Sequence, residues 1–176
     1  MFAPLAGWHE FFGLLGAAAA TLTALLFVAA SVGVGILSYE RSAGTRIYMS
    51  PVVAHFTAVL TTCAVGLIPS HSALSFALII GAGAGVGFVY STLLSIRIMK
   101  DAKVDFDDKL CHGIAPPIGY AAGFAAAVLF YLDSPHAAAI LAGALLLLLL
   151  ANIRNAWDLT IFMARQHTAA KKSDSA

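Results

Sequence analysis

The chain has 176 residues, of which 60% are hydrophobic and only 11% are charged, and its net charge is +1. Soluble domains carry about 25% charged residues, and a globule of this size could not hide so much apolar surface from water. Together with a mean hydropathy of +0.88, this composition excludes an ordinary soluble enzyme, a nucleic-acid-binding protein and a disordered chain. Two cysteines are too few for a disulfide scaffold. The composition therefore indicates a membrane protein.

Five apolar stretches are long enough to cross a bilayer as helices, which takes about 17–25 residues. They cover residues 11–37, 52–68, 73–98, 114–132 and 137–162. Their apolar runs do not alternate with polar residues, as transmembrane strands would. We therefore predict an all-α membrane protein in which a single domain, residues 1–165, holds five transmembrane helices and residues 166–176 form a polar tail.

Serine and proline mark the expected helix ends. Ser50–Pro51 and Ser134–Pro135 each place a capping hydroxyl before a proline, which is favoured at the first helical position. Pro69 is expected to end the second helix, and Ser70 or Ser72 to cap the third. The connectors after the second and fourth helices are very short, so each should join an antiparallel pair.

The basic residues predict the orientation through the positive-inside rule. All of them fall in the first connector, in or beside the third, or at and after the end of the fifth helix: Arg41, Arg46, Arg97, Lys100, Lys103, Lys109, Arg154, Arg165, Lys171 and Lys172. With five spans these regions share one side. The N-terminus is therefore expected outside and the C-terminus in the cytoplasm. The first helix has no basic segment before it and is too long for a cleaved signal, so we expect it to be retained.

Small residues recur at four-residue spacing in the spans, as in Gly81/Gly85, Gly83/Gly87 and Gly119/Gly123. This spacing lets membrane helices approach closely. The small residues serve either packing within one chain or self-association between chains. We expect a homo-oligomer.

A cluster of polar residues is expected in the inner third of the bilayer, at the cytoplasmic mouth. Its members are His55, Ser91, Ser95, Asn152, Arg154, Asn155 and Asp158. Polar groups at membrane depth often mark function, so one interpretation is a constriction or ion-binding site. The other is that Arg154 extends to the interface and pairs with Asp158, four residues later on the same helix face.

The predicted outer side carries a second, titratable cluster: His9, Glu10, His71, Asp133 and His136. Such side chains bind divalent metals or respond to mild acid, but they lie on three segments without a ligand-spacing motif. We therefore assign no metal, and the acidic third connector does not match a calcium loop. Paired histidines for haem are not evident, and nucleotide-loop and hydrolase motifs are absent. No cofactor and no enzymatic activity are predicted.

Segments near both ends of the chain resemble a known group of proteins. The segment Trp8-His9-Glu10-Phe11-Phe12, the alanine run 17–20 and the segment Ile153-Arg154-Asn155-Ala156-Trp157-Asp158-Leu159 resemble a widespread group of small bacterial polytopic membrane proteins of unknown function. The resemblance implies a multi-pass protein of the bacterial inner membrane and carries no activity.

Two functions fit this sequence. The first is a homo-oligomeric channel or small transporter for ions or protons, because polar groups gather at the inner mouth. The alternative is a non-catalytic accessory or regulatory subunit of a membrane complex, because little chemistry lies in the spans. The expected surroundings are the lipid bilayer and further copies of the chain, with no nucleic acid.

Overall fold

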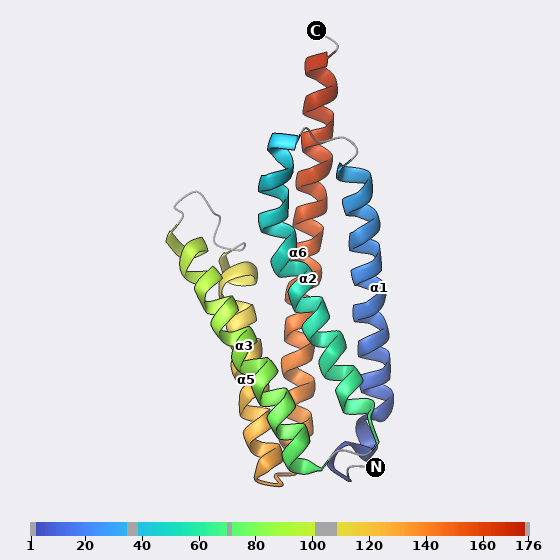
Figure 1. The fold of residues 1–176 in the computed structure, drawn as a ribbon, viewed down its shortest axis with the longest axis vertical. Helices are drawn as coiled ribbons and strands as arrows, with labels where there is room; N and C mark the ends of the chain where they lie inside the picture. The colour runs from blue at the N-terminus through green and yellow to red at the C-terminus, as the bar shows by residue number, and fades with distance from the viewer. Residues whose placement is uncertain (1–2, 35–38, 70–71, 101–108, 175–176) are drawn as a thin grey trace.

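The structure, a computed structural model, describes residues 3–34, 39–69, 72–100 and 109–174, and every element within these ranges is helical. In chain order they are the 3-10 helix η1 (Ala3–Trp8), α1 (His9–Val34), α2 (Tyr39–Leu67), α3 (Ala73–Lys100), the π-helical turn η2 (Lys109–Ile114), α5 (Ala115–Tyr131) and α6 (Ala137–Asp174). The long helices run alternately up and down, and the two termini lie at opposite ends of the bundle (Figure 1). We call these the N-terminal end and the C-terminal end. The expected antiparallel pairs are α2 with α3 and α5 with α6.

Four helices are long and apolar enough to cross a membrane, over His9–Ala29, Ala73–Met99, Cys111–Tyr131 and Ala137–Ile161. The second predicted span, residues 52–68, corresponds to a shorter apolar segment, Pro51–Leu67, within α2. Large apolar side chains cover the outer faces of these helices, among them Leu14, Leu78 and Val86. A surface of this kind suits hydrocarbon rather than water, which supports a multi-pass membrane protein.

The prediction that Ser50–Pro51 begins the second helix is wrong. Helix α2 begins at Tyr39 and contains Pro51 in its interior. Proline there removes one backbone hydrogen bond and kinks the helix without ending it, because the turns before it are already formed. Figure 1 shows α2 bending partway along its length. Arg41 and Arg46, expected in a connector, therefore belong to helical turns.

The other expected boundaries agree more closely with the structure. Helix α2 ends at Leu67, just before Pro69. Ser72 caps α3: the Ser75 N–H donates to Ser72 Oγ at 3.1 Å, and the Ser72 N–H donates to Ser75 Oγ at 3.1 Å. Ser70 lies outside the described residues.

The turn between α5 and α6 departs from the expected cap. Asp133 takes a left-handed conformation, with φ of 52°, which turns the chain after α5. Helix α6 begins at Ala137, two residues after the predicted Ser134–Pro135 start. The Ser134 hydroxyl still accepts from the His136 N–H at 3.4 Å.

Helix α6 holds the bundle together, because it packs on several of the other helices. The largest helix contacts are α3 with α5, α1 with α2 and α5 with α6, while α6 also packs on α2 and α1. Phe12, Phe56, Phe76 and Phe130 are fully buried in this packing. The 38 residues of α6 extend about 57 Å, longer than a ~30 Å hydrocarbon core. The residues predicted as a tail thus continue the helix to Asp174.

Glycines on α3 and α5 set how closely the helices approach. A Cβ at Gly87 would overlap the Tyr120 ring, and one at Gly119 would lie 2.7 Å from Cγ of Leu148. A Cβ at Gly83 or Gly85 would meet nothing within 4 Å. A Cβ at Gly81 would contact Ala127 on α5. In each four-residue pair on α3, one glycine therefore packs against α5 and the other faces open space.

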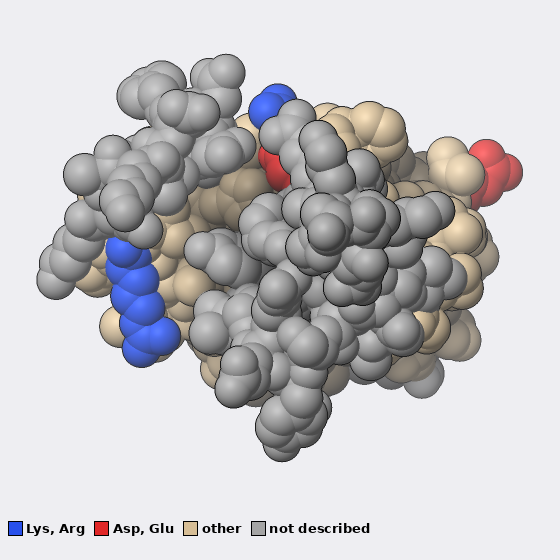
Figure 2. All heavy atoms as spheres, turned by 90° about the horizontal axis from the view of Figure 1, so that it is seen from above, with Lys and Arg blue, Asp and Glu red and all other residues tan. Residues whose placement is uncertain are grey.

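Few described charges lie at the C-terminal end. Arg97 and Arg154 are the described basic side chains, and both are exposed. Seen from this end, the visible Lys and Arg atoms lie near the periphery of the bundle (Figure 2). Such positions suit side chains that extend to an interface.

A prediction about packing follows from Gly87. Replacing Gly87 with Ala forces a Cβ into the Tyr120 ring and should lower the free energy of unfolding by about 1–3 kcal/mol. Gly85→Ala is the matched control, since its Cβ enters open space and both changes gain the same helix propensity. Thermal unfolding of the two variants in detergent measures the difference. Equal melting temperatures would contradict the close contact.

Candidate functional site

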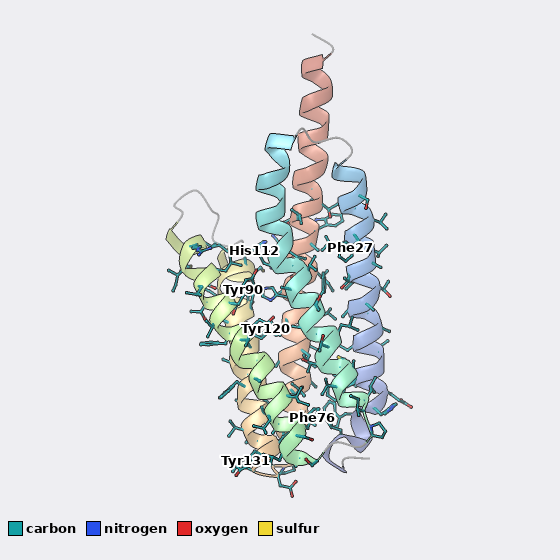
Figure 3. All side chains as sticks on the ribbon, viewed as in Figure 1. Phe27, Phe76, Tyr90, His112, Tyr120 and Tyr131 are labelled. Carbon is teal, nitrogen blue, oxygen red and sulfur yellow. The ribbon has the colours of Figure 1, made fainter. Side chains whose placement is uncertain are left out.

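A histidine and a tyrosine are hydrogen-bonded inside the bundle. His55 on α2 is 3% exposed, and its Nδ1 lies 2.8 Å from the hydroxyl oxygen of Tyr120 on α5. Tyr90 on α3 lies near the same imidazole, with ring centroids 6.3 Å apart. Figure 3 shows Tyr90, Tyr120 and His112 at successive levels of the α3–α5 pair. Helices α2 and α5 thus contribute two buried rings, and α3 adds Tyr90 at the edge, where it is 39% exposed.

Two asparagines on α6 extend this region. Asn152 donates from Nδ2 to the carbonyl of Val52 on α2 at 2.7 Å. Asn155, one turn later, donates from Nδ2 to the carbonyl of Cys111 in η2 at 3.4 Å. Side-chain amides thereby connect helix α6 to α2 and to η2.

The amide oxygens of these asparagines have no hydrogen-bond partner among the described residues, and Thr92 Oγ1 shares this condition. Asn152 is 1% exposed and Asn155 is 3% exposed. A buried polar atom without a partner costs about 1–3 kcal/mol. These oxygens are therefore acceptors suited to a water molecule, a cation or a proton donor.

One serine of α3, Ser95, binds the π-helical turn, and a second, Ser91, bonds within α3. The Ser95 hydroxyl lies against two acceptors, the carbonyls of Ser91 and Gly113. Ser91 donates to the carbonyl of Phe88 at 3.1 Å. A π-helical turn shifts backbone carbonyls out of the regular helical ladder, and such turns are frequent at functional sites. We define the polar network as His55, Tyr120, Ser91, Ser95, Asn152 and Asn155.

The structure separates the seven residues expected at the inner mouth. Five are buried: His55, Ser91, Ser95, Asn152 and Asn155. The other two form an ion pair, Arg154 Nε to Asp158 Oδ2 at 3.1 Å, with side chains 49% and 30% exposed. At about 100° per residue, they lie on nearly the opposite face of α6 from Asn152. This placement favours the interfacial interpretation of the ion pair.

The expected outer cluster remains on the surface. His9 and Glu10 are exposed at the start of α1, and Asp133 and His136 are exposed in the turn between α5 and α6. His71 lies outside the described residues. Within the described part of the chain, no three His, Cys, Asp or Glu side chains come together as metal ligands.

A cavity of about 440 Å³ adjoins the polar network. Helices α2, α3, α5 and α6 line it, and apart from Tyr120 and three threonines of α2 its walls are apolar. Tyr120 is the member of the polar network that lines the cavity, and Leu148 of its lining lies one turn before Asn152.

Sequence reasoning missed Tyr120. It lies in an apolar, alanine-rich span, where a tyrosine is easily counted as an interfacial aromatic. Its position in the middle of the span, beside Gly119, was the available signal. The acceptors on Val52, Cys111 and Gly113 are backbone atoms, and no residue pattern marks them.

Comparison of the chain with protein-family models, with curated proteins and with solved structures gave no match. The function is therefore inferred from the geometry of the chain itself.

The buried pair predicts unequal effects of two tyrosine substitutions on α5. Tyr120→Phe leaves His55 Nδ1 buried without its partner and should lower the free energy of unfolding by about 1–3 kcal/mol. Tyr131→Phe is the control, because that side chain is 65% exposed. Thermal unfolding of both variants in detergent checks this, and a loss in Tyr131→Phe as large as in Tyr120→Phe would refute it.

Proposed function

We propose that the protein is a small membrane transporter for protons or ions, with the polar network as its working site. The observation that supports this most is the His55–Tyr120 hydrogen bond, which lies between helices of an apolar bundle. Ionisable groups at membrane depth are rare and usually serve ion or proton movement.

The chemistry of the network suits a proton. An imidazole nitrogen and a phenolic oxygen at 2.8 Å exchange roles as donor and acceptor with little movement. The unpartnered oxygens of Asn152 and Asn155 would accept a hydrogen bond from water or coordinate a small cation. On α2, the Thr57 and Thr61 hydroxyls follow His55 along the cavity wall toward the N-terminal end.

Assembly and placement are part of the proposal. Only 28% of the apolar segment of α1 and 22% of that of α3 is buried inside the bundle. For α5 and α6 the buried shares are 50% and 56%. The outer faces of α1 and α3 are thus suited to lipid or to a second copy. We place the chain as a homo-oligomer in the bacterial inner membrane, with the N-terminus outside and the C-terminus in the cytoplasm.

Orientation is tested by cysteine labelling. In a background of Cys63→Ala and Cys111→Ala, a cysteine replaces Ser134 in the turn at the N-terminal end or Ser173 near the C-terminus. A membrane-impermeant maleimide should label intact cells at position 134 alone, and position 173 only after permeabilisation. The reverse pattern would invert the proposed topology.

Transport is tested in proteoliposomes. A proton gradient should collapse in the presence of the protein, followed by an internal pH-sensitive dye, and Tyr120→Phe should slow this at least about tenfold. Tyr131→Phe should leave the rate unchanged. Sodium and potassium flux are followed in parallel with isotope uptake. Absence of flux for protons and both cations would count against a transporter.

The second candidate is a non-catalytic accessory subunit of a membrane complex. The wide apolar faces of α1 and α3 favour it, because they would cover a neighbouring protein as well as lipid. An accessory subunit would bring down one constant partner from detergent extracts without crosslinking and would conduct nothing when reconstituted alone.

A further inference from the structure

We propose that the cavity between α2, α3, α5 and α6 binds a neutral amphiphile from the membrane, with one hydrocarbon chain and a hydroxyl or carbonyl head that meets Tyr120. This inference goes beyond the proton or ion transport proposed above, because it assigns an uncharged lipid-like ligand to the cavity that adjoins the polar network. It concerns binding and is tested without any gradient. Its basis is the form, the opening and the lining of the cavity.

Size and lining indicate an apolar occupant. The volume of about 440 Å³ falls within the range of roughly 300–1,000 Å³ that small-molecule pockets occupy. Water requires two to four polar partners in such a space, and most of the lining is Ala, Gly, Leu, Ile and Val. A hydrocarbon chain fits these walls.

The opening indicates entry from the lipid. Ala54, Thr57 and Thr61 on α2, and Ile79 and Gly83 on α3, both line the cavity and are exposed. Helices α2 and α3 pack on each other much less than α3 packs on α5, so the mouth lies between them. Since these are membrane-spanning segments, the mouth faces the bilayer sideways.

The position of Tyr120 indicates the head group. Tyr120 belongs to both the cavity wall and the hydrogen bond with His55. A hydroxyl offers one donor and two acceptor positions, so one bond to His55 leaves another for a ligand. The residues that line the cavity are all uncharged. A phosphate or carboxylate head would therefore be buried without a counter-charge, which is strongly unfavourable. An alcohol or a ketone head fits.

The test is photolabelling of the full chain in phosphatidylcholine nanodiscs. Three probes carry the same diazirine-bearing sixteen-carbon chain with different heads: an alcohol, a carboxylate and no head at all. Labelled peptides are identified by mass spectrometry. We expect the alcohol to label α2, α3 and α5 at the cavity and the carboxylate to label it weakly. Equal cavity labelling by the alcohol and the carboxylate would overturn the proposal.

Two glycines of α3 provide a matched pair of variants. Gly83→Leu fills the cavity and should reduce alcohol labelling by about tenfold or more. Gly85→Leu also enters open space, but Gly85 does not line the cavity, so labelling should persist. Tyr120→Phe should reduce labelling by the alcohol about 3–10-fold while leaving the headless probe unchanged. Equal labelling in both leucine variants would overturn the proposal.

The remaining outcomes are also decisive. If Gly83→Leu does not fold, Thr57→Phe fills the cavity from the opposite wall and carries the same expectation. If Gly83→Leu instead converts an oligomer into a monomer, and the alcohol labels no cavity residue in the parent protein, the space belongs to a second copy and the inference is wrong. Labelling without proton flux would leave the inference standing and remove only the transporter. Proton flux without labelling would do the reverse.

Discussion

The position of Tyr120 depends on the absence of a side chain at Gly87. The Tyr120 ring occupies the space that a Cβ on α3 would need, and this brings α3 and α5 into the most extensive helix contact of the bundle. The same placement carries the Tyr120 hydroxyl to His55 on α2. In hydrocarbon, a buried hydroxyl and a buried imidazole must find partners within the protein. One missing methyl group thus supports both the packing of a helix pair and the polar link to a third helix.

Helix α6 divides its two faces between different tasks. Asn152 and Asn155 face the bundle and donate to backbone carbonyls of α2 and η2, while Arg154 and Asp158 pair on an exposed face. The apolar residues before them, such as Leu141 and Leu148, form one wall of the cavity. A single helix therefore positions the network, lines the cavity and places charge toward the interface.

Much of the fold could be predicted from hydropathy, because helices that cross a bilayer must be long and apolar. The stretches at 73–98, 114–132 and 137–162 agree with α3, α5 and α6 apart from their ends. The start of α2 could not be predicted from Ser50–Pro51, since a proline inside a membrane helix bends it without ending it. Five polar residues could be selected as buried candidates by depth alone. Their partners depend on how the helices are rotated, and sequence spacing does not determine rotation between helices.

The acceptors in the network are mostly main-chain atoms, and this has a consequence for related chains. The carbonyls of Val52, Cys111 and Gly113 would accept the same bonds whatever side chains those positions carried. Selection would then act on the donors alone. A chain that keeps this arrangement should retain His, Tyr, Asn and Asn at intervals of 65, 32 and 3 residues, as at 55, 120, 152 and 155, while its apolar positions drift. Such a sparse signature would identify distant members of this architecture where overall similarity has faded.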